Sequence, residues 1–202
     1  MEKTKDFSRK AVWPGSTQLA PVPVVLVGSG DGEKYPWNLV TIAWAGTVNS
    51  NPPMVSISVR PERHSFPAIR ELGVFTVNIP PASLAKTVDW CGVVSGRDHD
   101  KIAEQHLTAV AGDKVCAPVL AECPLVLECK VAQSIDLGSH TLFLAEVVAV
   151  QAAEELIDKS GKFRIDDAGL LGYAHGHYYE LGKCLGHFGY SVRKKPGPTI
   201  RR

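Results

Sequence analysis

The amino-acid sequence predicts a mainly β protein, an antiparallel barrel into which a few short helices are inserted. Short runs rich in Val, Ile and Leu dominate the 202 residues, as is typical of strands. Tight turns join neighbouring runs, in keeping with a composition of 18 Gly and 14 Pro. The strand–helix–strand alternation of a parallel sheet does not appear, which favours a barrel over a doubly wound sheet.

Three strands are expected first. Residues 21–28 form a β-branched run that ends at the turn Gly-Ser-Gly-Asp-Gly, whose glycines permit positive φ. These glycines do not match a dinucleotide-binding loop, because Glu33 stands at the position of its last glycine. Strands over 37–48 and 54–61 follow, separated by a turn that contains two prolines.

The middle of the chain predicts short helices around one further strand. Ser65 is suited to begin the first helix and Gly73 to end it. Asp98 is expected to cap the last of them. The expected elements are a helix over 63–72, a strand over 74–80, a helix over 82–92 and a helix over 101–107.

The C-terminal half returns to strands. Long apolar runs over 123–138 and 140–156 are joined by Gly138-Ser139, which indicates a hairpin. Residues 157–182 are mixed, and the chain becomes tail-like near 187–202. We therefore expect one domain over 1–202 with a C-terminal tail.

Composition and charge narrow the function classes. The net charge of +1 creates no global field that would attract nucleic acid or a membrane surface. The N-terminal residues lack the apolar run of a signal peptide, and no apolar run reaches the length of a membrane span. The five cysteines lack zinc-like spacing, so we expect a reduced, cytoplasmic protein with buried thiols. His175 and His177 have no further ligands nearby in the sequence, so no metal site is predicted.

Polar groups on one strand face suggest a ligand. Ser56, Ser58 and Arg60 alternate with apolar residues, and alternate residues of a strand point to one side. Two hydroxyls and a guanidinium suit a ligand with an apolar body and an anionic end. An ordinary solvated face explains the same pattern. Trp44, on the strand that carries Thr41, is a candidate to flank a planar ring or to pack in the core.

Two basic segments are candidates for contacts with an anion or with nucleic acid. Arg97 and Lys101 lie beside Ser95-Gly96 at a turn into a helix, where backbone N–H groups and a cation could bind an anion. A solvated face is the alternative. The C-terminal tail is expected to be solvated rather than to bind nucleic acid, because it lacks interleaved aromatic residues. Its basic residues are Arg193, Lys194, Lys195, Arg201 and Arg202.

Five stretches, in order, resemble the flavin reductase-like family, and most closely its flavoredoxin branch. They are NLVTIAWAGTVNSNPPMVSISVRP, FTVNIP, DWCGVVSGRDHDKI, ECPLVLECKV and LGSHTLFLAEVVAV. The resemblance covers about residues 20–182. It implies a split β-barrel of antiparallel, Greek-key type that binds FMN non-covalently, and a homodimer with each flavin near the subunit interface.

The resemblance also implies roles for individual residues. One strand would border the isoalloxazine and a second would run along the flavin, with Arg60 near the phosphate or the pyrimidine end of the ring. The residues of these strands are Thr41, Ala43, Trp44, Ser56, Ser58, Val59 and Arg60. A turn would contact the ribityl-phosphate region through His64, Ser65 and Phe66. Ser95, Gly96 and Lys101 would lie near the phosphate or the interface.

Two assignments are weaker. His140 belongs to a Gly-Ser-His-Thr motif and is expected near the flavin, contributed by its own subunit or by the partner. Asn78 follows a strand and is either a flavin contact or a buried, turn-forming asparagine.

The implied activity is that of an oxidoreductase. FMN would carry the chemistry, so no catalytic side chain is predicted. NADH, NADPH or a redox protein are the candidate electron donors, and the resemblance leaves the choice open. The alternative is a non-redox barrel that binds nucleic acid or a protein partner.

Overall fold

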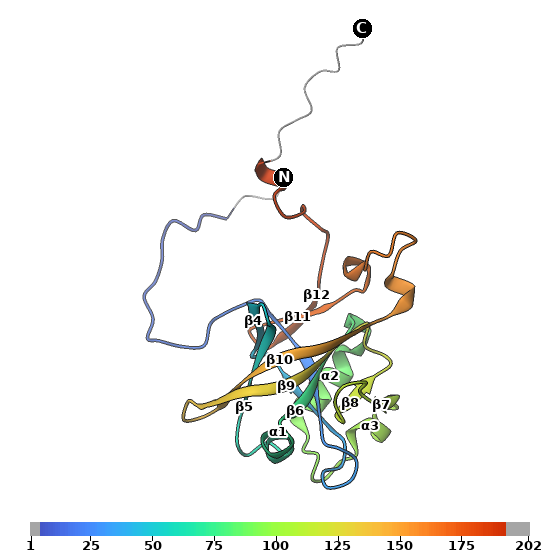
Figure 1. The fold of residues 1–202 in the computed structure, drawn as a ribbon. Coiled ribbons are helices and arrows are strands. Elements are labelled where there is room, and N and C mark those ends of the chain that lie inside the picture. The colour runs from blue at the N-terminus through green and yellow to red at the C-terminus, as the bar shows by residue number, and fades with distance from the viewer. Residues whose placement is uncertain (1–4, 193–202) are drawn as a thin grey trace.

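The computed structural model describes residues 5–192, and its centre is one curled, seven-stranded antiparallel sheet (Figure 1). Its strand order is β3-β2-β6-β9-β10-β5-β4. The strands are β2 (Val25–Ser29), β3 (Asn38–Ile42), β4 (Ala45–Ser50), β5 (Pro53–Val59), β6 (Val74–Ile79), β9 (Leu125–Asp136) and β10 (Thr141–Ala152). This arrangement confirms the predicted mainly β, antiparallel class.

Smaller elements flank the main sheet. A three-stranded sheet contains β1 (Val22–Pro23), β11 (Leu171–Ala174) and β12 (His177–Glu180), and a two-stranded one contains β7 (Ala109–Ala111) and β8 (Pro118–Leu120). The α-helices are α1 (Phe66–Leu72), α2 (Ala85–Val93) and α3 (Lys101–Glu104). Single 3₁₀ turns are η1 (Ala82–Leu84), η2 (Glu154–Leu156), η3 (Ile165–Asp167) and η4 (Tyr190–Val192).

The two predicted hairpins are present. Gly30 and Gly32 have φ of 102° and 79° in the β2–β3 connection, which is why that turn is rich in glycine. Gly138 has φ of 90° between β9 and β10. β9 and β10 pair along almost their whole length, with register shifts at two places.

The expected single strand over 37–48 is instead two strands. The chain turns at Ala43 and Trp44, so that β3 pairs with β2 while β4 pairs with β5. The Ser58 N–H donates to the Trp44 carbonyl at 3.0 Å and holds this corner against β5. The next strand ends at Val59, one residue before Arg60, so Arg60 lies beyond the strand on which it was predicted.

The helix boundaries also differ from expectation. Ser65 begins α1 without a capping hydrogen bond; its hydroxyl instead accepts from the Asn38 amide at 2.8 Å. Gly73 ends α1 in the left-handed conformation, as predicted. Asp100 rather than Asp98 caps α3, because its carboxylate accepts from the Ala103 N–H at 3.1 Å. Asp98 belongs to the preceding turn, where its N–H donates to Ser95.

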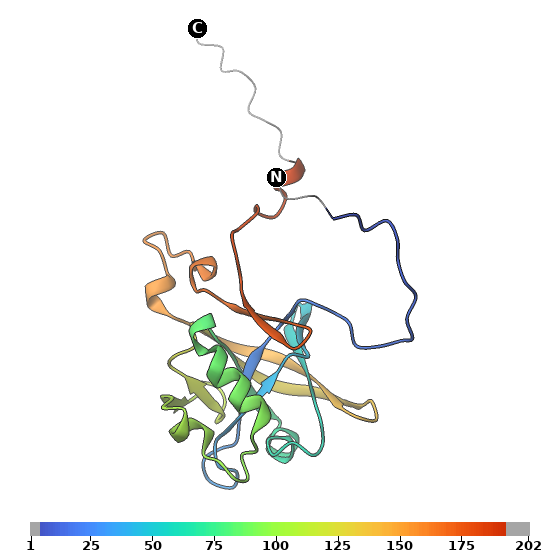
Figure 2. The same cartoon turned by 180° about the vertical axis from the view of Figure 1, so that it is seen from behind.

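Strand β2 is buried on both faces and separates two apolar clusters. Val25 and Val27 face the interior of the curled sheet, where α1 also packs. Val24 and Leu26 point to the other side, against α2. The period of two along a strand therefore assigns neighbouring valines and leucines to different clusters. α2 consequently lies over one side of the sheet and brings its C-terminal end close to β3 (Figure 2).

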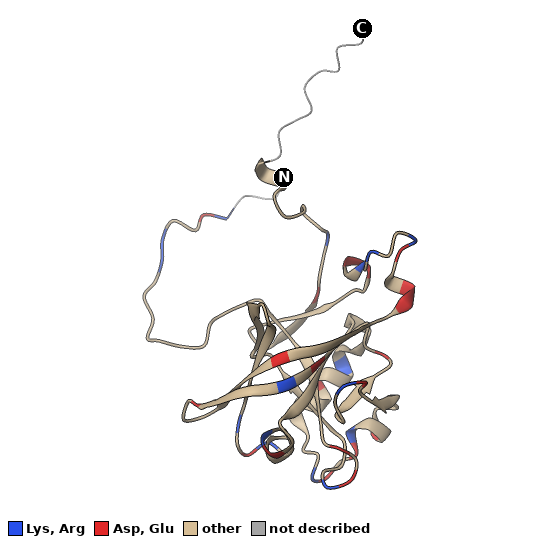
Figure 3. Cartoon of the chain, viewed as in Figure 1, with Lys and Arg blue, Asp and Glu red and all other residues tan. Residues whose placement is uncertain are grey.

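Residues 5–20 and 181–192 extend away from the sheets (Figures 1 and 2) and are exposed. Acidic and basic residues are interspersed along the loops and helices rather than gathered on one face (Figure 3). Within residues 5–192, no helix is both long and apolar enough to cross a membrane. The basic residues of the C-terminal tail lie outside the described part of the chain; they are Arg193, Lys194, Lys195, Arg201 and Arg202.

The expectation of buried thiols is correct for three of the five cysteines. Cys91, Cys123 and Cys129 are buried, whereas Cys116 and Cys184 are exposed, and all five are free. Burial raises the pKa of Cys91 to about 11 and that of Cys129 to about 12, so neither is a reactive thiolate at neutral pH.

Candidate functional site

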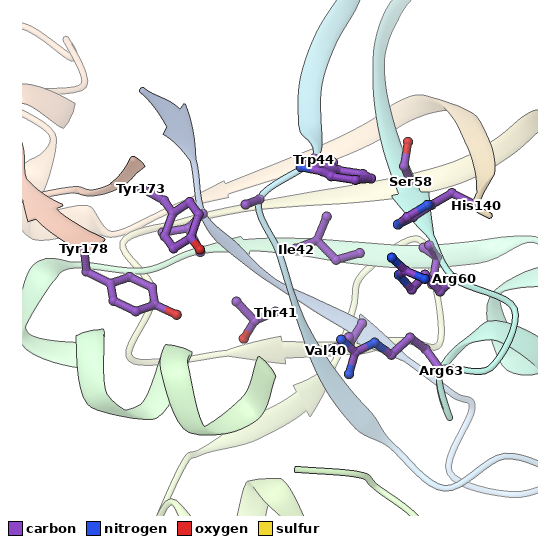
Figure 4. Close-up of a pocket in the computed structure, with 13 residues that line it drawn as sticks. Val40, Thr41, Ile42, Trp44, Ser58, Arg60, Arg63, His140, Tyr173 and Tyr178 are labelled. Atoms are coloured by element: carbon purple, nitrogen blue, oxygen red, sulfur yellow. The ribbon is translucent and has the colours of Figure 1, made fainter. Parts of the chain in front are cut away.

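A pocket of about 260 Å³ opens where β3 ends, and we call it the aromatic pocket (Figure 4). The corner after β3 contributes Trp44, and the β11–β12 hairpin contributes Tyr173 and Tyr178. His140, just before β10, lies beside Trp44 with ring centroids 4.5 Å apart. The aromatic pocket is lined by Val24, Val40, Thr41, Ile42, Ala43, Trp44, Ser58, Val59, Arg60, Arg63, His140, Tyr173 and Tyr178.

Two of the side chains that line this pocket are anchored to the α2 helix. The Thr41 hydroxyl donates to the Val88 carbonyl, and the Tyr178 hydroxyl donates to the Asp89 carboxylate at 3.1 Å. Burial, together with the bond to Asp89, raises the pKa of Tyr178 to about 12. The hydroxyl therefore stays protonated at neutral pH, and it positions the aromatic ring rather than supplying a base.

A second pocket, of about 510 Å³, adjoins the first, and we call it the basic pocket. The two pockets share Val40, Arg60 and Arg63. Arg60 and Arg63 enter from the segment between β5 and α1 (Figure 4). The remaining lining residues are Asn38, Glu62, His64, Ser65, Val93, Val94, Ser95, Gly96, Arg97 and Lys101. Arg60, Arg63, Arg97 and Lys101 oppose one acidic residue, Glu62, so an anion is favoured here.

Lys101 links two of the segments that form the basic pocket. Its side chain is 4% exposed, and its ammonium donates to the Cys91 carbonyl at 2.7 Å and to the Leu39 carbonyl at 2.9 Å. These bonds join the C-terminal part of α2 to β3. Burial lowers the pKa of Lys101, and the nearby Arg63 lowers it further. The ammonium is held mainly by backbone carbonyls.

Close packing explains the glycine at position 96. A Cβ there would lie 2.3 Å from the Asn38 side-chain oxygen and 2.8 Å from His64, far inside van der Waals contact. Only glycine allows the loop after α2 to approach β3 so closely. The loop therefore reaches the same pocket as the segment that carries Arg63 and His64.

Both histidines of the site favour the neutral form. Burial lowers the pKa of His140, and Arg60 adds to the effect. Burial also lowers the pKa of His64, with contributions from Arg97 and Lys101. Neutral imidazoles at pH 7 leave the arginines and Lys101 as the cationic groups of the site.

The structure brings most of the predicted site residues together. Thr41, Ala43, Trp44, Ser58, Val59, Arg60 and His140 line the aromatic pocket, and His64, Ser65, Ser95, Gly96 and Lys101 line the basic pocket. Arg60 lines both. Ser56 lies two residues before Ser58 on β5 and lines a neighbouring groove that also contains Trp44. Ser56 and Ser58 are partly exposed between buried apolar residues, as the strand alternation predicted.

Two predicted residues lie away from these pockets. Phe66 is buried in the core against Phe143, with ring centroids 5.8 Å apart. Asn78 is fully buried; its amide donates to the Leu26 carbonyl at 3.1 Å, and its oxygen accepts from the Leu120 N–H at 2.8 Å. Asn78 is therefore buried, as the second alternative expected, but it lies within β6 rather than in a turn.

Sequence reasoning missed Arg63, Tyr173 and Tyr178. Arg63 follows Arg60 by three residues, so the spacing of basic residues in the turn was an available signal. The tyrosines lie in a segment of mixed character, and the pairing of β1 with β11 places them at the pocket. Among residues 5–192, no group of three potential metal ligands is present, and the His177 ring contacts the His175 carbonyl at 2.8 Å.

An apolar, aromatic pocket that leads into a cationic one suits a ligand with a flat apolar body and an anionic group at its other end. Thr41 and Ser58 are small polar residues among those that line the aromatic pocket (Figure 4). The two residues suit a ligand whose flat ring also carries polar atoms at its edges.

Comparison with known proteins agrees with this geometry. Residues 17–182 match the family model of the flavin reductase like domain. Two solved flavoredoxins share the fold at 30% identity. That of Desulfovibrio vulgaris (Miyazaki F) has a TM-score of 0.84 and that of Methanosarcina acetivorans a TM-score of 0.80, and each alignment covers 92% of this chain and 100% of the other.

A curated relative is similar over a slightly shorter span. The NADH-dependent FMN reductase AsuE2 of Streptomyces nodosus subsp. asukaensis is 29% identical over 147 residues, which are 70% of this chain and 77% of the relative. The match to the family model extends over more than half of the chain and includes every residue that lines the two pockets. This protein therefore belongs to the flavin reductase-like family.

Proposed function

We propose that this protein is an FMN-dependent oxidoreductase that holds the isoalloxazine in the aromatic pocket and the phosphate in the basic pocket. One observation carries the proposal: the two pockets are continuous through Arg60 and Arg63. A single ligand can thus place a flat ring among aromatic side chains and an anion among cations. The NADH-dependent FMN reductase and the two flavoredoxins among its relatives support flavin as that ligand.

The residues present fit the chemistry of FMN. Trp44 and Tyr173 offer flat apolar surface, and the Ser58 and Thr41 hydroxyls border the ring pocket. Arg63, Arg97 and the Ser95–Gly96 loop converge on the phosphate end. Arg60 lies at the junction, where its charge favours negative charge on the ligand. Ser58 and Arg60 therefore orient the ring, while the basic pocket anchors its tail.

Bound FMN supplies hydride and single-electron transfer. The chain contributes binding, orientation and charge. Tyr178 keeps its proton at neutral pH, and His140 is neutral there, so we assign them to the pocket wall. No side chain is required to act as a general acid or base.

Two electron donors are consistent with family membership. NADH or NADPH would make the protein a flavin reductase that supplies reduced flavin to a partner enzyme. A redox protein as donor would make it a flavoredoxin-like carrier. The similarity to an NADH-dependent FMN reductase supports the first, and the similarity to flavoredoxins supports the second.

We also propose a homodimer in the cytoplasm. The extended end segments expose large apolar side chains, among them Trp13 at 73%, Leu185 at 88% and Phe188 at 106%. Exposed apolar groups of this size favour burial against another surface, and a second copy of the chain is the proposed surface. Five free cysteines suit a reducing compartment.

The test begins with the purified protein and added FMN. We expect a yellow complex whose flavin fluorescence changes on binding, and oxidation of NADH or NADPH that depends on free FMN if the protein is a reductase. Slow oxidation of both nicotinamides, with reduction by a ferredoxin-type donor, would instead assign the carrier role. A colourless protein that cannot be loaded with FMN would overturn the proposal.

A further inference from the structure

Four polar side chains from the walls of the two pockets make hydrogen bonds to a single helix, α2. They come from four separate segments, namely β3, the turn before α1, the start of α3, and β12. Their partners on α2 lie within residues 88–92, and none of these residues lines either pocket. The bonds run from Thr41 to Val88, from Tyr178 to Asp89, from Lys101 to Cys91 and from Arg63 to Gly92.

Two cations hold the C-terminal end of α2 at the basic pocket. The last carbonyls of a helix have no partner within it and carry partial negative charge. The Arg63 guanidinium donates to the Gly92 carbonyl at 3.2 Å, and the Lys101 ammonium donates to the Cys91 carbonyl at 2.7 Å. A guanidinium has five N–H donors, so Arg63 can keep its bond to α2 while its other donors hold an anion in the pocket.

One turn earlier, α2 holds the wall of the aromatic pocket. The Asp89 carboxylate accepts from the Tyr178 hydroxyl at 3.1 Å, and the Tyr178 ring packs edge-on against Tyr173, with centroids 5.3 Å apart. Asp89 is exposed and lines neither pocket. Its influence on the aromatic pocket therefore acts through the orientation of Tyr178.

Close packing joins the two ends of this arrangement. α2 lies over one side of the sheet (Figure 2), and its Val88 and Cys91 side chains are fully buried. A Cβ at Gly92 would lie 3.2 Å from the Thr41 Cβ, so the helix is already in close contact with β3. Interiors packed at this density transmit a displacement instead of absorbing it. A change in the placement of α2 at one pocket is thus felt at the other.

We propose that α2 couples the two pockets, with Asp89 as a positioning residue, so that an anion held by Arg63 strengthens the binding of a flavin ring beside Tyr178. This inference rests on the proposed flavin site and adds to it. The anion fixes the Arg63 guanidinium and with it the C-terminal end of α2. A ring packed against Tyr178 fixes the same helix through Asp89. Because each ligand orders a helix that the other also needs in place, the coupling is positive.

A direct effect through shared lining residues is the alternative explanation. Val40, Arg60 and Arg63 line both pockets, and an anion that acted on them alone would also alter the binding of a ring. Asp89 distinguishes the two explanations, because it lies outside both pockets and reaches the aromatic one only through its bond to Tyr178.

The test uses the two parts of FMN as separate ligands of the full chain. Riboflavin carries the ring without the phosphate, and inorganic phosphate supplies the anion. Quenching of flavin fluorescence gives the Kd for riboflavin in phosphate and in chloride at equal ionic strength. We expect phosphate to lower this Kd about fivefold, at the lower end of the usual range of coupling. Riboflavin should lower the Kd for phosphate, measured by calorimetry, by the same factor.

Variants of Asp89 and Tyr178 locate the coupling. Asp89→Ala should abolish the effect of phosphate on riboflavin and raise the Kd for FMN about fivefold. Asp89→Asn removes the charge but keeps an acceptor for the Tyr178 hydroxyl, so it should retain most of the coupling. Tyr178→Phe should abolish the coupling from the other side of the bond, and combining it with Asp89→Ala should cause no further loss. Lys86→Ala, at an exposed position of α2, should behave like the wild type.

The outcomes separate this inference from the proposed function. Equal Kd values for riboflavin in phosphate and in chloride would overturn the coupling and leave the flavin site intact. Coupling that survives both Asp89→Ala and Tyr178→Phe would assign the effect to the shared lining residues and overturn the role of α2. The wild-type measurement needs no variant, and Tyr178→Phe tests the same bond should Asp89→Ala fail to fold. Failure to bind both riboflavin and FMN would remove the proposed function together with the inference.

Discussion

The indole of Trp44 and the imidazole of His140 lie with ring centroids 4.5 Å apart and planes tilted by 41°. Trp44 comes from the corner between β3 and β4, and His140 from the turn before β10. Nearly a hundred residues separate them in sequence. Because β10 and β4 each pair with β5, strand β5 between them brings the two rings to one wall of the aromatic pocket.

Removal of the indole should weaken flavin binding. Trp44 is 46% exposed, so much of its surface is available to a ligand. We expect Trp44→Ala to raise the Kd for FMN roughly tenfold, about 1.4 kcal/mol, through loss of aromatic contact. Quenching of flavin fluorescence measures it. Tyr179→Ala is the control, because Tyr179 is 55% exposed and lines neither pocket. An unchanged Kd in Trp44→Ala would exclude the indole from the site.

Arg60 should contribute charge to binding. Its guanidinium lines both pockets and lies 3.5 Å from the Glu62 carboxylate. Arg60→Ala should weaken FMN binding by about 1.5–3 kcal/mol, the usual range for a hydrogen bond to a charged group. The loss should shrink at high salt, which screens exposed charges. Arg9→Ala, in the exposed N-terminal segment, should bind FMN normally; equal affinity of the two variants would contradict the assignment.

Lys101 should matter for stability as well as for the site. Lys101→Met removes two hydrogen bonds from an ammonium that is almost fully buried, and it leaves the carbonyls of Cys91 and Leu39 without that donor. Unsatisfied buried groups cost about 1–3 kcal/mol each, so we expect a loss of roughly 2–5 kcal/mol. Urea unfolding measures it. Lys159→Met, at an exposed position, serves as the control and should unfold like the wild type.

The charged Glu128 carboxylate should stabilise the fold at neutral pH and lose this effect in acid. Burial opposes its charge, but hydrogen bonds from the Gln151 amide and from the N–H groups of Lys114, Asp113 and Val115 outweigh it and lower the pKa below 4.5. A lowered pKa contributes stability above pH 4.5 that is lost as the pH falls through the folded-state value. Glu128→Gln should therefore be less stable at pH 7, by about 2 kcal/mol.

The difference between this variant and the wild type should narrow below pH 4.5, because the wild-type carboxylate then takes up its proton. Chemical unfolding at pH 7 and near pH 3 measures both values. Glu154→Gln, at an exposed position, is the control. A difference that is the same at both pH values would rule out the charged form as the cause.

The two site histidines should make the free protein less stable in mild acid. The pKa values of His64 and His140 are lowered from 6.5, so just below pH 6.5 the unfolded chain holds protons that the folded chain does not. The free energy of unfolding should thus decrease from pH 7 to pH 5. His140→Gln should flatten this decrease, and His187→Gln, in the exposed C-terminal segment, should not. Parallel pH profiles in all three proteins would contradict the prediction.

Local patterns predicted much of the fold. The glycine-rich turns and the alternation along β5 were visible in the sequence because turn geometry and strand period depend on neighbouring residues. The corner at Trp44 was missed, since strand propensity continues through it and only the change of pairing partner ends β3. The helix cap was assigned to Asp98 instead of Asp100 because an aspartate suits the capping position equally well at either place. The turn that precedes α3 engages Asp98 and leaves Asp100 to cap the helix.

Some residues of the candidate site were predicted from the sequence, and others were not. Ser58 and Arg60 were found from the alternation along one strand, and Lys101 from the basic turn that precedes its helix. His140 was found because it lies in a stretch that resembles a known family. Tyr173 and Tyr178 escaped notice because the pairing of β1 with β11 across some 150 residues brings them to the pocket. Asn78 has a suitable residue type, yet its amide is fully engaged with β2 and the β8 strand.

By itself, the sequence determined the strand-rich class, the turns and the family, because these follow from residue type, spacing and order along the chain. The tertiary structure decided that the aromatic and basic pockets are continuous. Continuity depends on how closely loops from β3, α1 and α2 approach one another, and the absence of a Cβ at Gly96 and the buried bonds of Lys101 set that approach. Such distances arise from packing between segments far apart in the chain, which no local pattern encodes.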